Sequence, residues 1–207
     1  MNTTTLHLIR HAEVEARYQG VFGGTIDMDL SPRGQEQAAA LARCLKRKTF
    51  HAIYASPMKR VQQTLVPVLQ ANGVPPPVIM PDLHEVDFGD WTGLTFAEVL
   101  RKFGVSASSW LDLFGRGEIP NAENAATYRV RVELCVAEIL QRHPGQRVAI
   151  FCHGGVIRQI IAILLDLPLP KTAGFEIEYA SVTEVDIHPH RAEIQLLNFT
   201  PWRDLNS

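Results

Sequence analysis

Four side chains that can carry positive charge follow three predicted strands of this chain. Arg10 and His11 come directly after an apolar strand near the N-terminus. Arg60 lies in the first turn after a second apolar strand, and His153 directly follows a third. Because parallel strands end at one edge of a sheet, where open α/β sheets bind their ligands, we expect the four side chains to meet there. Any one of them alone is more often a surface or capping residue than a functional one.

Together these side chains predict a binding site for a phosphate group. Two guanidiniums and two imidazoles in one crevice repel one another unless a dianion lies between them, and the guanidinium fork matches phosphate oxygens. Gly154 and Gly155, directly after His153, bring backbone amides and a helix N-terminus to the same place. Helix N-termini favour anions, so we expect Gly154 to contribute to phosphate binding.

Such a site can transfer the phosphoryl group that it binds. A neutral imidazole, with an ordinary pKa of about 6.5, is a usable nucleophile near neutral pH, and a covalent intermediate divides one hard displacement into two. Fixed positive charge stabilises the equatorial oxygens of the transition state. The leaving alkoxide needs a proton, which a nearby carboxylic acid can donate. The candidates for this acid are Glu13, Glu85, Asp87 and Asp90.

Five segments resemble, in the same order, sequence blocks of the histidine phosphatase superfamily, the phosphoglycerate mutase-like proteins. Residues 8–13 (LIRHAE) are similar to the Arg-His-Gly-Glu signature of that family. The other segments are residues 29–34 (DLSPRG), 54–60 (YASPMKR), 83–93 (LHEVDFGDWTG) and 152–155 (CHGG). The resemblance covers most of the chain, and the fourth segment is more similar to the phosphatase branch than to the mutase branch.

The resemblance implies a role for each matching residue. His11 corresponds to the nucleophile that becomes phosphohistidine, and Glu85 to the proton donor. Arg10 and Arg60 correspond to the phosphate clamps, and His153 to a second imidazole that donates to the transferring group. The resemblance therefore implies a metal-independent phosphomonoesterase that needs no cofactor and acts on a small phosphorylated metabolite.

Three features depart from the family's pattern. Ala12 stands where Gly is usual, and residues 121–124 replace a stretch that more often reads Gly-Glu-Ser. Arg17 stands where an Asn commonly helps to hold the phosphate. We expect Arg17 either to add a third guanidinium to phosphate binding or to point to solvent.

A competing interpretation starts from a cysteine. Residues 152–158 also fit C-x-x-G-x-x-R, the phosphate-binding loop of cysteine-dependent phosphatases, in which a thiolate of low pKa attacks. This interpretation leaves Arg10, His11, Arg60 and Glu85 without roles. Because side chains alternate along a strand, we expect Cys152 to face away from His153 and into the core.

Three further alternatives stay open. A metal site built from His11, Glu13 and His153 is disfavoured by the adjacent guanidiniums and by the lack of further carboxylates. A phosphoglycerate mutase must enclose its phosphoryl group, whereas this chain has only a modest insert. A non-catalytic phosphate-binding module would not require His11, Glu85 and His153 together.

The elements that must position these residues follow from hydrophobic periodicity. Short apolar runs alternate with stretches of helical period, which predicts an α/β fold: a three-layer sandwich with a mostly parallel central sheet flanked by helices. Strands are expected at residues 6–9, 52–55, 78–80 and 148–152, with a closing hairpin at 182–197. Helices are expected after Ser31-Pro32 and Ser56-Pro57, where each serine is predicted to be the N-cap and each proline the first helical residue. Further helices are expected from Glu123 and after Gly154-Gly155.

The length of 207 residues indicates a single domain over 1–207. Gly and Pro residues between 89 and 120 indicate an irregular lid insertion at about 89–122, with one or two short helices. Five aromatic residues are expected near the mouth of the crevice, where they would pack the lid or contact a ring-bearing leaving group. They are Phe22, Trp91, Phe96, Trp110 and Phe114.

Composition limits the partners. With 20 Lys and Arg against 22 Asp and Glu and no basic run, we expect a small phosphate ester and no nucleic acid. The chain has no apolar run long enough to span a membrane, so no membrane partner is expected. Its three separated cysteines predict no disulfide framework and a cytoplasmic location. The sequence leaves a monomer and a homodimer open, and sugar phosphates, nucleotides and ribazole phosphate all remain candidate substrates.

Overall fold

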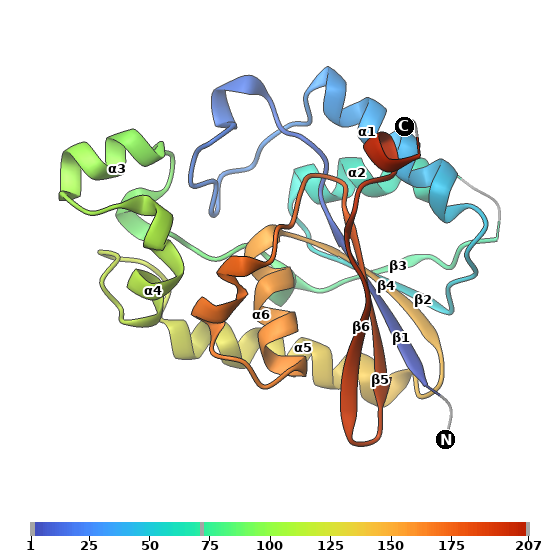
Figure 1. Cartoon of the computed structure of the whole chain (residues 1–207). Helices are drawn as coiled ribbons and strands as arrows, with labels where there is room; N and C mark the ends of the chain where they lie inside the picture. Colours follow the sequence, from blue (N-terminus) through green and yellow to red (C-terminus); the bar gives the residue numbers. More distant parts are fainter. Residues whose placement is uncertain (1–2, 71–72, 206–207) are drawn as a thin grey trace.

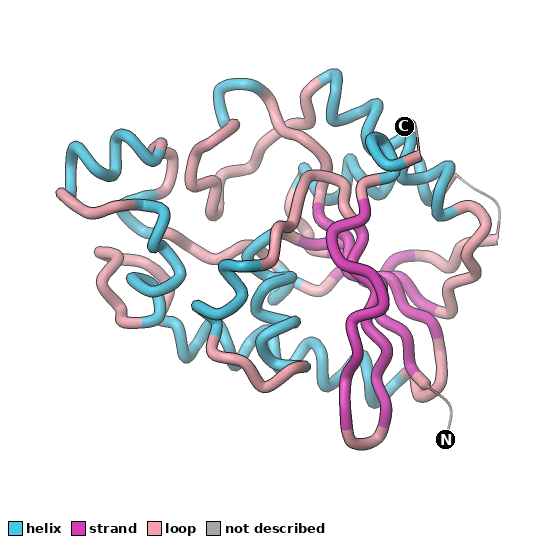
Figure 2. Tube along the Cα trace, in the orientation of Figure 1, coloured by secondary structure: helices cyan, strands magenta, loops and turns pink. Residues whose placement is uncertain are grey.

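A six-stranded sheet forms the centre of the computed structural model, which describes residues 3–70 and 73–205 (Figures 1 and 2). Its strands are β1 (Thr4–Arg10), β2 (Ala52–Ala55), β3 (Pro77–Ile79), β4 (Arg147–Cys152), β5 (Val182–His188) and β6 (Arg191–Phe199). The order within these residues is β3-β2-β4-β1-β5-β6. The first four strands in this order are parallel, whereas β5 and β6 are antiparallel, so the prediction of a mostly parallel sheet is confirmed.

Helices cover both faces of this sheet (Figure 1). They are α1 (Pro32–Leu45), α2 (Lys59–Leu69), α3 (Phe96–Phe103), α4 (Trp110–Gly115), α5 (Ala125–Arg142), α6 (Gly154–Leu164) and the short α7 (Pro201–Asp204). Helices α1 and α2 pack on one face, and α5 and α6 on the other, which is the predicted three-layer sandwich. Among the helices described, none is long and apolar enough to cross a membrane.

Strand β1 supplies both apolar layers of the core. Leu8 belongs to the cluster that contains Ile157 of α6, whereas its neighbour Ile9 belongs to the cluster that contains Leu41 of α1. Successive side chains of a strand point to opposite faces, so a strand covered on both sides must be apolar at nearly every position. This explains why β2 and β4 are visible in the sequence as continuous apolar runs, and β1 as an apolar run that only His7 interrupts.

The two predicted serine caps have different outcomes. Ser31 caps α1, because its hydroxyl accepts a hydrogen bond of 2.9 Å from the Gly34 amide and Pro32 is the first helical residue. The cap predicted at Ser56 is wrong, since α2 begins at Lys59 with Met58 at the N-cap. The Ser56 hydroxyl lies instead 2.8 Å from Nε2 of His153, at the end of the neighbouring strand.

Residues 89–122 carry α3 and α4 and lie beside the end of the sheet, in green in Figure 1. Trp91 and Phe114 of this segment are almost fully buried in the same apolar cluster as Tyr128 of α5. The segment therefore shares its core with the rest of the fold. This supports our proposal that residues 1–207 form one domain with an insertion at about 89–122.

Candidate active site

The register of the central strands brings two histidines together. In the parallel pair of β1 and β4, Arg10 lies opposite Cys152, so the residues that follow each strand end are His11 and His153. Their ring centroids are 5.3 Å apart, and the His11 amide donates to the Cys152 carbonyl at 3.1 Å. Both imidazoles thus lie at the carboxyl edge of the sheet.

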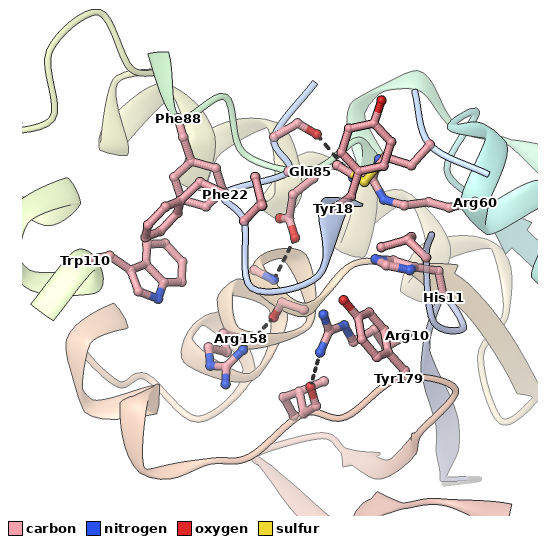
Figure 3. A pocket seen from close by; sticks show the side chains of 18 of the residues that line it. Arg10, His11, Tyr18, Phe22, Arg60, Glu85, Phe88, Trp110, Arg158 and Tyr179 are labelled. Atoms are coloured by element: carbon pink, nitrogen blue, oxygen red, sulfur yellow. Dashed lines mark hydrogen bonds between the residues drawn. The ribbon is translucent and has the colours of Figure 1, made fainter. Parts of the chain in front are cut away.

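A cavity of about 200 Å³ opens at this edge (Figure 3). Arg10, His11, Arg60, Glu85 and Gly154, which the sequence assigned to one site, all line it. The second imidazole, His153, is fully buried beside His11. The structure therefore brings together the residues expected at the strand ends.

The hydrogen bonding of His11 determines which ring nitrogen is available. Nδ1 lies 2.9 Å from the carbonyl oxygen of Ala12, an acceptor, so Nδ1 carries the hydrogen and Nε2 keeps its lone pair. Burial, and then the charges of Arg60 and Arg10, hold the pKa of His11 well below its ordinary value. His11 is therefore a neutral imidazole with Nε2 available as a nucleophile.

Arg60 is positioned by the loop before α1. Its Nη1 donates to the Ile26 carbonyl at 2.7 Å and its Nη2 to the Gly24 carbonyl at 3.1 Å. Burial lowers the pKa of Arg60 to about 10, which still leaves the guanidinium charged at neutral pH. This almost fully buried charge lines the cavity, where little solvent reaches it to screen it.

Arg10 is positioned from the opposite side of the cavity. Its Nη1 donates to the Ile177 carbonyl at 2.6 Å, and its guanidinium lies 4.1 Å from the centre of the Tyr179 ring. Its Nε is buried and has no hydrogen-bond partner among the residues described. A buried donor left without a partner is costly, which is the condition expected of a group that binds a ligand oxygen.

The second imidazole, His153, is oriented by Ser56 through the 2.8 Å contact at Nε2. Burial, followed by the charges of Arg60 and Arg10, lowers the pKa of His153 well below its ordinary value. Its Nδ1 is buried and lacks a partner within residues 3–70 and 73–205. The ring is thus neutral and one of its nitrogens is unpaired, although His153 itself is not among the residues that line the cavity.

Of the four candidate acids, Glu85 is the one that lines the cavity in the described structure. Its Oε2 accepts a hydrogen bond of 3.1 Å from the Gly155 amide, and its Oε1 one of 3.0 Å from the Val86 amide. In Figure 3 the carboxylate lies between Arg60 and His11 on one side and Phe22, Phe88 and Trp110 on the other. Glu85 is therefore placed to exchange a proton with a group bound in the cavity.

The other three carboxylates have different partners. Glu13 accepts a hydrogen bond of 2.7 Å from the Ser31 hydroxyl, Asp87 one from the Gly89 amide, and Asp90 one from the Asn121 side chain. Because Glu13 is turned toward Ser31, it does not complete a ligand set with the two histidines. Within the part of the chain that the structure describes, no three His, Cys, Asp or Glu residues are grouped to hold a metal ion.

One residue that holds the Glu85 loop was missed in the sequence. Arg131 of α5 is 8% exposed and donates to the carbonyl oxygens of His84 and Glu85, at 2.9 and 3.4 Å. Its guanidinium is also paired with the Glu123 carboxylate through two hydrogen bonds, of 2.7 and 2.9 Å. The available signal was a charged residue on the apolar face of a helix, beside Tyr128.

The third guanidinium at the cavity is not Arg17. The Arg17 side chain is 68% exposed, pairs with Glu15 at 2.8 Å and does not line the cavity. Arg17 therefore points to solvent, which is one of its two expected positions, because Glu15, two residues earlier, pairs with its guanidinium there. Arg158 lines the cavity instead, where it donates to the carbonyls of Gly154 and Phe175.

The thiol of Cys152 faces the core. The residue is fully buried within an apolar cluster that includes Val156, and burial raises the pKa of its thiol far above the ordinary value. A thiolate nucleophile needs the opposite shift. This geometry disfavours the cysteine-dependent interpretation.

The chain is similar along most of its length to known proteins of one family. The model of the histidine phosphatase superfamily (branch 1) matches residues 6–200. Phosphoserine phosphatase 1 of Hydrogenobacter thermophilus is 33% identical over 196 residues, which cover 94% of this chain and 92% of that one. A 2,3-bisphosphoglycerate-dependent phosphoglycerate mutase of Methylobacterium radiotolerans is 33% identical and covers 77% of this chain and 78% of its own. The crystal structure of the alpha-ribazole phosphatase from Shigella flexneri has a TM-score of 0.82 at 28% identity, and the match covers 95% and 96% of the two chains.

Proposed function

The chain belongs to branch 1 of the histidine phosphatase superfamily and is a phosphomonoester hydrolase, and on that premise we propose how its residues divide the reaction. His11 is the nucleophile, Arg10 and Arg60 bind the phosphate, and Glu85 transfers the proton. The observation that supports this most strongly is the neutral His11 ring, with Nε2 free, beside two guanidiniums and a carboxylate in one cavity.

In the first step, Nε2 of His11 attacks phosphorus and the bond from phosphorus to the alcohol oxygen breaks. Glu85, protonated at this stage, donates its proton to that oxygen, so the product leaves as a neutral alcohol. Arg10 and Arg60 stabilise the charge on the equatorial oxygens during transfer. His11 is left as a phosphohistidine.

In the second step, water attacks the phosphorus of the phosphohistidine. Glu85, now a carboxylate, takes a proton from that water, and the bond from His11 to phosphorus breaks. Inorganic phosphate leaves, and His11 returns to its neutral form. Each group ends the cycle in the state in which it began.

His153 and Gly154 complete the phosphate site in this proposal. His153 donates to a phosphate oxygen from a ring that Ser56 orients. Gly154 is the first residue of α6, so the amides of that helix N-terminus face an anion bound at the strand ends. Both groups act on the transferring phosphoryl and neither takes part in proton transfer.

The substrate is a small phosphate ester. The relatives named for phosphoserine and for alpha-ribazole phosphate support a small phosphorylated metabolite as the natural substrate of this chain as well. A cavity of about 200 Å³ has room for a molecule of that size. Hydrolysis without an added metal ion is part of the proposal, because every step above is assigned to a side chain.

Trapping the intermediate tests this proposal. Brief reaction with a ³²P-labelled phosphomonoester should give a phosphoenzyme that is stable in alkali and labile in acid, as a phosphoramidate is. The His11→Ala protein should fold and give neither phosphoenzyme nor turnover, whereas Cys152→Ser should keep both. An acid-stable adduct, or one that depends on Cys152, would contradict the proposed nucleophile. Transfer of the label to a phosphoglycerate in place of water would indicate a mutase.

A further inference from the structure

Resting on the proposed phosphatase function, we infer that the leaving-group end of the cavity is a binding site for a flat apolar ring. The preferred substrates are then phosphate monoesters whose alcohol carries an aromatic group. Esters of small polar alcohols or of amino acids are poorer substrates. The inference depends on where the aromatic side chains lie relative to the proton donor.

The cavity has two chemically different ends (Figure 3). Arg60 and His11 lie at one end, Phe88 and Trp110 at the other, and the Glu85 carboxylate lies between them. The acid must contact the oxygen that joins phosphorus to the alcohol, since it protonates that atom. An ester with its phosphate at the cationic end therefore extends its alcohol toward the aromatic end.

The aromatic wall is formed by rings that hold one another in place. The centroids of Phe22 and Phe88 are 4.9 Å apart, and those of Phe88 and Trp110 are 5.2 Å apart, both edge to face. Phe96 is stacked on Phe22 at 5.0 Å with an interplanar angle of 18°. Because Phe22 and Phe88 are almost fully buried, the wall is formed before a ligand binds and loses little conformational entropy on binding.

The two rings at the rim come from the inserted segment. Phe96 begins α3 and is 49% exposed although it lines the cavity, and Trp110 begins α4 and is half-buried. Trp91 and Phe114, the other aromatic residues of this segment that the sequence grouped with them, are core residues instead. An exposed large ring next to a reactive site offers apolar surface that a ligand ring can cover.

The aromatic end of the cavity offers few charged partners to a leaving group that itself carries a charge. Among the described residues that line it, Glu85 is the one carboxylate, and it is assigned to proton transfer. The ammonium of an amino-acid ester would therefore lack a counter-charge of its own. The Nη atoms of Arg158 already donate to the carbonyls of Gly154 and Phe175, and only its buried Nε lacks a partner among the described residues, so Arg158 offers a carboxylate no bidentate pair.

Matched alkyl phosphates test the inference without a change in leaving-group chemistry. 3-Phenylpropyl phosphate and propyl phosphate both release a primary alcohol, so a difference in kcat/KM reports the ring. The wild type should prefer the phenylpropyl ester by about tenfold. Phe96→Ala and Trp110→Ala should each lower this preference about threefold or more, chiefly through KM, as the loss of one aromatic contact implies.

Leu100→Ala is the matched control, because Leu100 lies one turn after Phe96, is 56% exposed and does not line the cavity. It should leave the preference unchanged. Competitive inhibition of the wild type by 3-phenylpropylphosphonate and by propylphosphonate gives a second measurement that needs no variant. The phenyl compound should bind about tenfold more tightly.

The outcomes separate the two proposals. Equal kcat/KM for both esters together with equal inhibition by both phosphonates, or a higher kcat/KM for phosphoserine than for the phenylpropyl ester, would overturn the aromatic site and leave the phosphatase mechanism intact. A preference that survives in both Phe96→Ala and Trp110→Ala would also overturn the assigned wall. Failure to hydrolyse any of these esters, with no phosphoenzyme formed, would instead contradict the proposed function.

Discussion

The Gly155 amide donates a hydrogen bond of 3.1 Å to Oε2 of Glu85, and a β-carbon at residue 155 would overlap Oε1 of the same carboxylate. Gly155, the second glycine after His153, therefore makes room for Glu85, because the carboxylate occupies the space that a side chain at residue 155 would fill. The proposed acid, Glu85, and helix α6 are coupled through this contact.

Gly155→Ala should displace the Glu85 carboxylate and act as a mild form of Glu85→Gln. Both variants should slow phosphorylation by an alkyl phosphate, Glu85→Gln by about two to four powers of ten, the usual range for general acid–base catalysis. The loss should be smaller with p-nitrophenyl phosphate, since p-nitrophenolate leaves without a proton. Rapid-quench measurement of the phosphorylation step is needed, because the same carboxylate later acts as the base.

Gly115→Ala provides the control, because the nearest atom to an added β-carbon there is 3.9 Å away. It should phosphorylate at the wild-type rate. If Gly155→Ala keeps full activity on alkyl phosphates, or if Glu85→Gln slows both substrates equally, Glu85 only shapes the pocket and the acid must be sought among Glu13, Asp87 and Asp90.

Arg131→Met should lower both stability and turnover. The change leaves Glu123 without its partner and frees the carbonyls of the Glu85 loop. Removal of one partner of a fully buried ion pair costs about 3–5 kcal/mol, which is an upper limit for this partly buried pair. Turnover of alkyl phosphates should fall further than that of p-nitrophenyl phosphate, because the displaced group is Glu85, the proposed acid. Urea unfolding and the two kinetic assays measure these effects separately.

Arg129→Met is the matched control on the same helix, since Arg129 is exposed and its ion pair with Glu133 has a distance of 3.8 Å. Exposed pairs of this kind contribute about 0–1 kcal/mol. Equal destabilisation by the two changes would show that Arg131 has no special structural role. If Arg131→Met lowers the turnover of both substrates equally, Arg131 does not act by positioning Glu85 for proton transfer.

Arg17→Ala should leave kcat/KM within about twofold of the wild type, whereas Arg60→Met should lower it by about two to three powers of ten. The reason is location: Arg17 pairs with Glu15 in solvent, and Arg60 is buried against the cavity. Steady-state kinetics on one alkyl phosphate are sufficient. A large loss in Arg17→Ala would mean that its side chain moves into the site when substrate binds, as the family's pattern at this position implies.

His7 should make the fold less stable in mild acid. Burial lowers the pKa of His7 to about 4, from an ordinary value of 6.5. The Glu184 carboxylate, 2.9 Å away, opposes this shift, and the Lys48 ammonium, 3.1 Å from the same ring nitrogen, adds to it. Between pH 6.5 and pH 4 the unfolded chain therefore binds more protons than the native one, so the free energy of unfolding falls as the pH falls through this window. The buried rings of His11 and His153 act in the same direction.

Urea unfolding at several pH values tests this. His7→Gln should make the dependence on pH between 6.5 and 4 less steep, and His190→Gln, in the exposed turn between β5 and β6, should not change it. A dependence that is unchanged in His7→Gln would mean that the ring is charged in the native state.

The sequence by itself determined the sheet and the meeting point of the reactive groups. Strands covered on both faces must be apolar at nearly every position, so β2 was predicted at its observed bounds and β1 and β4 within two residues. A parallel sheet then brings the ends of these strands to one edge. The proximity of Arg10, His11 and His153 follows from chain order and strand direction alone.

Only the tertiary structure decided which nearby residues join that site. Arg131 and Glu85 are 46 positions apart, and the hydrogen bond between them depends on how α5 packs beside the loop. Local sequence likewise could not show that Ser56 contacts His153 and does not cap a helix, or that Trp110 lines the cavity while Trp91 is buried. Periodicity records whether a side chain is covered, whereas the identity of the group that covers it depends on contacts between distant segments, which form only in the folded chain.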